Sequence, residues 1–164
     1  MTDVETAAAL SAFKTRLAAA QTPDAPWSAL QELTEKLVGV KLFTIMTVDM
    51  VAEVARRAYS SNPEAYPVSG TKPIHYDSWF ETVHLQQRPF IANTIADISE
   101  VFGDHELIWS LGCGSVINLP VVVDGVLLGT VNMLHEEHFY TEARVEAAVS
   151  LLTEPSLAAF RAAA

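Results

Sequence analysis

The segment LGCGSVINLPVVVDGVLLGTVNMLH, which runs from Leu111 to His135, decides the fold of this chain. Two apolar runs flank Asp124 and Gly125. Such a pair between apolar runs is a strong signal for a β-hairpin, because both central residues of a type I′ turn need positive φ. Neither face of the resulting hairpin is consistently polar. We therefore expect both faces to be covered, which places the hairpin in the centre of an antiparallel sheet.

The two-residue turn also predicts which side chains share a face of the hairpin. If both strands are regular, Asn118 lies opposite Val131. In that register Ser115 and Asn132 point to one face, and Asn118 points to the other. A buried amide in the middle of a sheet needs a hydrogen-bond partner. Either a ligand or the backbone of an adjacent loop would supply one for Asn132.

Helical and strand patterns alternate along the rest of the chain, joined by short turns. This order predicts an α+β fold in which helices pack on an antiparallel sheet. Asp24, Asp104 and Thr141 are the expected N-terminal caps of three helices, and Pro155 is expected to kink the last one. The expected elements are helices within 1–38, strands at 41–49, 51–61 and 90–92, a loop at 62–73, a short helix at 76–86, two helical turns around residue 103, the hairpin, and a helix over 141–164.

Length and composition favour one domain, residues 1–164, and exclude several classes of protein. No apolar run approaches the roughly 18 residues that cross a bilayer, so no membrane association is expected. The net charge is −10, and the longest basic run is Arg56-Arg57, which argues against a nucleic-acid partner. The first residues carry acids before their apolar stretch, unlike a signal peptide. Cys113 is the single cysteine, which suits a reducing compartment and predicts a cytoplasmic protein.

Residues 115 to 134, SVINLPVVVDGVLLGTVNML, resemble the signature of the GAF domain family. In that pattern an apolar strand ends near a proline, a turn with glycine follows, and the next strand begins with a glycine. The resemblance implies a GAF/profilin-like α/β/α sandwich with a central antiparallel sheet of five or six strands. Terminal helices would cover one face, and loops with short helices would roof a small-molecule pocket on the other. It also implies a homodimer formed through the terminal helices.

Aromatic side chains concentrate in the segments that would roof such a pocket. If these segments form the roof, their rings supply apolar walls with polar tips, which suit a small organic ligand. Ordinary packing of the same rings onto the sheet is the alternative. With the two polar residues assigned to the pocket face, the candidate ligand-binding residues are Tyr59, Tyr66, Trp79, Trp109, Ser115 and Asn132.

An enzyme is the alternative to a stand-alone regulatory or sensory binding domain. Cys113 lies between two glycines and would be a nucleophile if a neighbour lowered its pKa, although a small buried side chain at the start of a strand is the preferred interpretation. His75, beside the proline-rich loop, is the candidate acid/base residue, and Tyr76 is a further candidate beside the substrate. The segment DISEVFGDHELI is similar to the free methionine sulfoxide reductase branch of the family. That branch exchanges several cysteines, and this chain has only one, which argues against its reaction.

No metal or other cofactor is expected. The run His135-Glu136-Glu137-His138 contains suitable ligand types, but it follows a strand, and this spacing suits a metal on a helix. A solvated loop before the final helix is the preferred interpretation. His84, on the short helix, is expected at the surface. The sequence therefore predicts binding of a small polar or aromatic metabolite beneath residues 59 to 79.

Overall fold

The computed structural model describes residues 1–164. The helices and strands follow the order expected from the sequence, and the segment expected as a loop at 62–73 ends in an additional short strand. In chain order they are α1 (Asp3–Ala18), α2 (Ala25–Leu37), β1 (Leu42–Asp49), β2 (Val54–Ser60), β3 (Lys72–Pro73), α3 (Ser78–Phe80) with the π-helical turn η1 (Glu81–Leu85), β4 (Phe90–Ala92), α4 (Ile95–Ser99), α5 (His105–Ser110), β5 (Ser115–Val123), β6 (Val126–His135) and α6 (Glu142–Ala163).

Six strands form one antiparallel sheet in the order β3-β2-β1-β6-β5-β4. The prediction of a central antiparallel sheet of five or six strands is confirmed. The hairpin β5–β6 lies inside the sheet, as its two apolar faces required. Strand β3 is an edge strand, where Pro73 is tolerated because its missing N–H would not have served an interior ladder.

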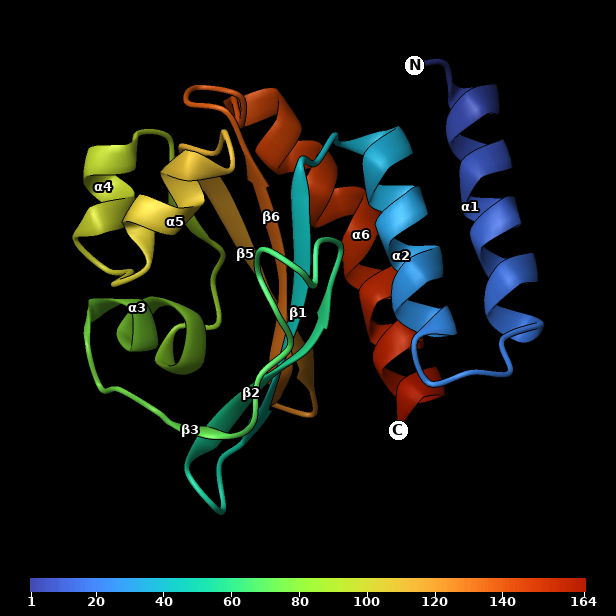
Figure 1. The fold of residues 1–164 in the computed structure, drawn as a ribbon. Helices are drawn as coiled ribbons and strands as arrows, with labels where there is room; N and C mark the ends of the chain where they lie inside the picture. Colours follow the sequence, from blue (N-terminus) through green and yellow to red (C-terminus); the bar gives the residue numbers. More distant parts are fainter.

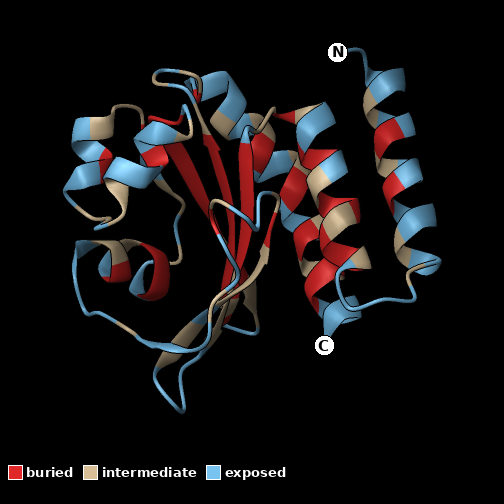
Figure 2. Ribbon diagram, viewed as in Figure 1, coloured by how far each residue is buried: buried red, intermediate tan, exposed pale blue.

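Helices cover both faces of the sheet in separate groups. Figure 1 shows α1, α2 and α6 on one side, and α3, α4 and α5 on the other. In Figure 2 the middle strands and the inner sides of α2 and α6 are buried. A large apolar core lies between the sheet and the terminal helices, and a smaller one lies beneath α4 and α5. We call the side of the sheet that α1, α2 and α6 cover the helix face, and the side that α3, α4 and α5 cover the roof face.

A β-bulge in the hairpin changes the register expected from the sequence. Asp124 and Gly125 both have positive φ, as the turn requires. The pairing then shifts by one residue, which leaves Leu128 as the extra residue of β6. Asn118 therefore lies opposite Asn132, and its expected pairing with Val131 is wrong. Both amides consequently share the roof face.

A second bulge lies between β1 and β2. Tyr59 pairs with Ile45 and Arg57 pairs with Met46, so Ala58 is the extra residue. A regular strand would place residues 57 and 59 on one face. The bulge instead directs Tyr59 to the helix face and Arg57 to the roof face.

Helix caps follow the sequence in one case of three. Thr141 caps α6 by accepting a hydrogen bond from the backbone N–H of Arg144, whereas Asp24 and Asp104 make no side-chain cap bond. Helix α6 continues through Pro155 to Ala163. None of the helices has the combination of length and hydropathy required to span a lipid bilayer.

Candidate functional site

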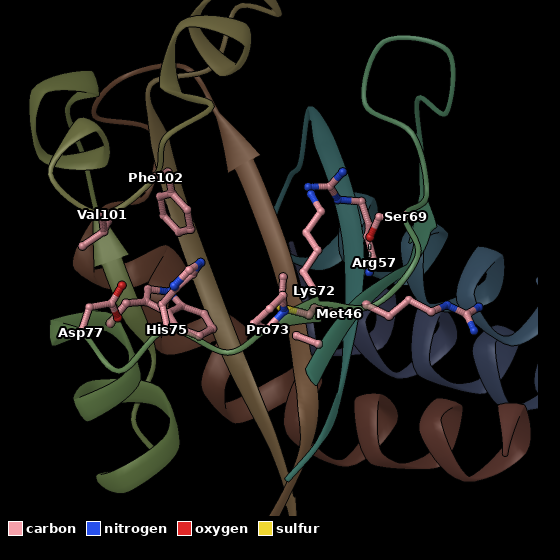
Figure 3. A pocket seen from close by; sticks show the side chains of 12 residues that line it. Met46, Arg57, Ser69, Lys72, Pro73, His75, Asp77, Val101 and Phe102 are labelled. Carbon is pink, nitrogen blue, oxygen red and sulfur yellow. Dashed lines mark hydrogen bonds between the residues drawn. The ribbon is translucent and has the colours of Figure 1, made fainter. Parts of the chain in front are cut away.

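Two adjoining chambers lie between the roof face of the sheet and the segments that cover it. The inner chamber has a volume of about 110 Å³ and rests on β1, β5 and β6. The outer chamber has a volume of about 210 Å³ and lies against β2, β3 and the segment before α3. Met46, Arg57, Trp79 and Phe102 line both chambers, which places the two side by side. Figure 3 shows the outer chamber.

A hydrogen-bonded row of polar side chains forms the floor of the inner chamber. The indole N–H of Trp79 donates to Asn118 Oδ1 at 2.9 Å, and Asn118 Nδ2 donates to Asn132 Oδ1 at 2.7 Å. Asn132 Nδ2 then donates to Thr44 Oγ1 at 3.1 Å. The last three residues are direct cross-strand neighbours on β5, β6 and β1. We call Thr44, Asn118 and Asn132 the amide row. It fixes one roof residue, Trp79, to the sheet.

The amide row is buried, which makes its remaining hydrogen-bonding capacity chemically significant. Thr44, Asn118 and Asn132 are each less than 7% exposed. Each amide retains one unused N–H, and the Thr44 hydroxyl donates to no protein acceptor. Buried donors of this kind normally have partners. The floor of the inner chamber therefore offers donors to a bound molecule.

Tyr66, Asp104 and Arg57 form another wall of the inner chamber. The Tyr66 hydroxyl donates to Asp104 Oδ2 at 2.5 Å, and the guanidinium of Arg57 lies 3.8 Å from the centre of the Tyr66 ring. Burial, followed by the bond to Asp104, raises the pKa of Tyr66, so the phenol stays neutral and donates. The carboxylate of Asp104 is drawn to this pair instead of capping α5.

The short helix and the π-helical turn η1 place an aromatic cluster in the roof. Trp79 meets the edge of the His84 ring, and Phe80 stacks on it at 4.4 Å. His84 is only 9% exposed, so its expected surface position is wrong. Its Nδ1 has no hydrogen-bond partner, and burial lowers its pKa. The apolar neighbours of this ring favour the neutral imidazole.

Basic residues outnumber acidic ones in the lining of the outer chamber. Arg56, Arg57 and Lys72 line it from β2 and β3, and His75 and Asp77 lie across it (Figure 3). Asp77 is the only carboxylate in this lining, and its Oδ1 accepts the backbone N–H of Phe80. The carboxylate therefore serves the start of α3.

Three of the expected ligand-binding residues line the chambers. Tyr66 and Asn132 line the inner chamber, and Trp79 lines both. His75, the candidate acid/base residue, lines the outer chamber.

Tyr59 and Ser115 do not lie where the sequence placed them. The bulge at Ala58 turns Tyr59 to the helix face, where its hydroxyl donates to Gln31 Oε1 at 2.5 Å. Ser115 shares the helix face with Ile117, because alternate residues of β5 point the same way. Its hydroxyl donates to the backbone carbonyl of Glu136 at 2.6 Å.

Trp109 and Tyr76 also lie outside both chambers. Trp109 is 54% exposed on the outer side of α5. Tyr76 is 62% exposed and packs against Phe80 with ring centres 4.6 Å apart. Trp109 belongs to α5, whose buried residue is Ile108, and Tyr76 precedes α3.

Cys113 is fully buried in the smaller core and lines neither chamber. Burial raises the pKa of its thiol, although Lys41 acts in the opposite direction. A nucleophilic thiol needs a lowered pKa and access to its substrate. The position of Cys113 gives it neither and fits a small buried side chain.

The segment from His135 to His138 has structural partners. His135 stacks on Phe139 with ring centres 3.5 Å apart, and the carboxylate of Glu137 accepts the backbone N–H of Ile95. No group of three or more potential metal-ligating side chains occurs in the structure.

Sequence reasoning missed several residues that line the chambers, chiefly Asn118, Arg57, Asp104 and Phe102. A regular hairpin would place Asn118 on the helix face. In the sequence, Arg57 stands out only as part of a short basic run. A bulge leaves no clear mark in a strand of mixed residues such as VARRAYS, so the alternation of side chains could not have identified either one.

Comparison with known proteins gives one family and many similar structures. A family model described as GAF domain matches residues 27–158. The GAF domain of an Acinetobacter phosphoenolpyruvate-protein phosphotransferase is similar with a TM-score of 0.73 and 13% identity, covering 99% of this chain and 96% of that one. The corresponding Coxiella burnetii domain has a TM-score of 0.70 and 17% identity, covering 99% and 95%. The GAF domain of a Bacillus halodurans two-component sensor histidine kinase has a TM-score of 0.69 and 12% identity, covering 87% and 95%. No curated protein sequence matches the chain.

Proposed function

The chain belongs to the GAF domain family, and on that premise we propose that residues 1–164 form one regulatory domain that binds a small organic metabolite in the two chambers. The observation that carries this proposal is the amide row. Its buried donors and acceptors form the floor of a chamber whose other walls are mostly apolar and aromatic, with Arg57 and Asp104 as the charged residues among them. An apolar hollow with a few convergent polar groups is the usual form of a small-molecule site.

The roof offers a route by which binding would be transmitted. Trp79 lines both chambers, and its one side-chain hydrogen bond to the sheet goes to Asn118. A ligand that contacts the amide row would compete for, or reinforce, this bond. Similar domains occur in a sensor histidine kinase and in phosphotransferases, which supports a regulatory role over a purely structural one.

A thermal-shift screen against metabolites tests the proposal. A ligand at 100 times its Kd adds about 2.7 kcal/mol to the free energy of unfolding. For a domain of this size that corresponds to a rise in Tm of roughly 5–10 °C. In an NMR spectrum the same compound should move the indole N–H signal of Trp79 and leave that of Trp109 in place.

Two matched variants complete this test. Asn132→Leu is expected to abolish the thermal shift, because it removes the centre of the amide row. Trp109→Phe should leave the shift intact, because Trp109 lies outside both chambers. A hit whose effect survives Asn132→Leu, or that moves only the Trp109 signal, would contradict this location.

We also propose a cytoplasmic homodimer joined through the terminal helices. Helix α1 contributes only Ala9 and Phe13 to the buried residues, and Val4 on the same helix is 79% exposed. A second copy of α1 would cover this surface. Light scattering should give twice the chain mass, and Val4→Glu should shift the mass toward that of one chain. A monomer at concentrations of about 100 μM would contradict the dimer.

A further inference from the structure

We infer that the ligand of these chambers is a small organic anion, with its carboxylate or phosphate group in the outer chamber and an apolar body in the inner chamber. This inference rests on the proposed function, because it names the chemical class of the molecule bound there. It is carried by the distribution of charge around the outer chamber, by the geometry of Arg57 and by the apolar lining of the inner chamber.

The charge of the outer chamber is opposite to that of the chain. The protein has 20 acidic and 10 basic residues and a net charge of −10. Of the 12 residues that line the outer chamber, three are basic and one is acidic; Arg57 and Lys72 lie on the roof face, whereas Arg56 pairs with Thr47 and directs its side chain to the opposite face. At the average frequency of the chain, 12 residues would include fewer than one base. Concentrated positive charge in a concave surface attracts anions.

Arg57 is held in position with donors to spare. Its side chain is only 16% exposed, and its guanidinium lies on the ring of Tyr66. One N–H donates to the carbonyl of Pro67 at 2.8 Å. The guanidinium has five N–H groups, so this bond and its contacts with Tyr66 and Asp104 leave donors for a ligand. The planar fork of an arginine matches a carboxylate or a phosphate in a bidentate arrangement.

The neighbouring carboxylates neutralise this charge only in part. Asp104 Oδ2 is 4.0 Å from the guanidinium and already accepts the short hydrogen bond from Tyr66. Asp77 is engaged with the start of α3. Lys72 is an exposed residue at the edge of the outer chamber and has no carboxylate within ion-pair distance. Arg57 and Lys72 therefore leave net positive charge for a ligand.

The inner chamber suits the opposite end of such a molecule. Phe102, Ile108, Val116 and Leu134 provide apolar surface, and Trp79 adds an aromatic face. Burying this surface against a hydrocarbon body is favourable, whereas a second charged group would lose its hydration there. The amide row supplies neutral donors at the end of the chamber. An alkyl or aryl acid, or a monophosphate with an apolar body, fits both chambers.

Matched pairs of acids and neutral analogues test the inference. The probes are phenylacetate beside phenylacetamide, hexanoate beside hexanamide, and benzyl phosphate beside benzyl alcohol, titrated into the full chain. Binding is followed by calorimetry and by the indole N–H signal of Trp79. We expect at least one anion to bind tenfold or more tighter than its neutral partner, and to weaken between 50 and 300 mM salt because screening reduces the attraction.

Charge-neutral substitutions locate the effect. Lys72→Gln and Arg57→Gln should each weaken the anion by fivefold or more and leave the neutral partner unchanged. Lys14→Gln on α1 makes the same change of charge at an exposed residue away from the chambers and should alter neither. Arg57 also packs on Tyr66, so Arg57→Gln can fail to fold. In that case Lys72→Gln alone tests whether the chamber binds the anion.

The outcomes separate this inference from the proposed function. If neutral compounds move the Trp79 signal as well as or better than their acids do, the anion inference is overturned and the proposed site stands. If anions bind but Lys72→Gln and Lys14→Gln change their affinity by the same factor, the anion inference is also overturned. If no anion and no metabolite of the thermal-shift screen moves the Trp79 signal, the proposed function fails and the inference fails with it.

Discussion

Replacing Asn118 with leucine should destabilise the domain and release Trp79 from the sheet. The substitution removes the hydrogen bond from the Trp79 indole, worth about 1 kcal/mol. It also leaves the buried Oδ1 of Asn132 without its donor, which costs about 1–3 kcal/mol. The free energy of unfolding should therefore fall by about 3 kcal/mol. For a domain of this size the corresponding decrease in Tm is roughly 6–12 °C.

A double-mutant cycle measures the bond between Trp79 and Asn118 directly. Urea denaturation of the wild type, Asn118→Leu, Trp79→Phe and the double variant should give a coupling energy of about 1 kcal/mol. The control cycle pairs Asn118→Leu with Trp109→Phe. It should be additive within about 0.5 kcal/mol, because Trp109 is exposed and does not line the chamber that holds the amide row.

Two results would refute this reasoning. One is a stability for Asn118→Leu within about 0.5 kcal/mol of the wild type, which would mean that the amide row contributes nothing beyond its volume. The other is an unchanged indole N–H signal of Trp79 in that variant. Either result would place Trp79 somewhere other than on Asn118 and would remove the link between roof and sheet.

Three further predictions follow from other parts of the structure. Gly129→Ala should lower the free energy of unfolding by about 3 kcal/mol or more, because the added Cβ would overlap the backbone carbonyl of Met46 and approach Phe160. Gly70→Ala, which has no atom near the added Cβ, should change it by less than about 0.5 kcal/mol. Urea denaturation measures both variants. The free energy of unfolding should decrease as the pH falls below about 6.5, because burial lowers the pKa of His84 and the unfolded chain then binds the proton more readily. His84→Leu should weaken this dependence of stability on pH without abolishing it, since the pKa of His135 is lowered as well. A pH dependence that does not change in the variant would show that His84 is solvated. Iodoacetamide should alkylate Cys113 much more slowly in the native protein than in urea, because the thiol is buried with a raised pKa, and equal rates measured by mass spectrometry would contradict that burial.

The sheet, its order of elements and the family were accessible from sequence because local patterns encode them. The Asp124-Gly125 turn, the apolar runs beside it and the helical spacing near both ends each reflect an interaction between residues close in the chain. The resemblance to the GAF domain family implied that the middle segments roof the sheet, and Tyr66 and Trp79 of those segments line the chambers above it.

The set of polar residues that meet in the chambers depended on tertiary structure. Single extra residues at Ala58 and Leu128 reverse which face the neighbouring side chains occupy, and so bring Arg57 and Asn118 to the roof face and take Tyr59 away from it. A bulge is stabilised by the packing of the whole strand against its partners, so it has no local sequence signal in this chain. The sequence by itself thus determined a roofed antiparallel sheet, and only the three-dimensional packing decided which charges and amides face the hollow beneath that roof.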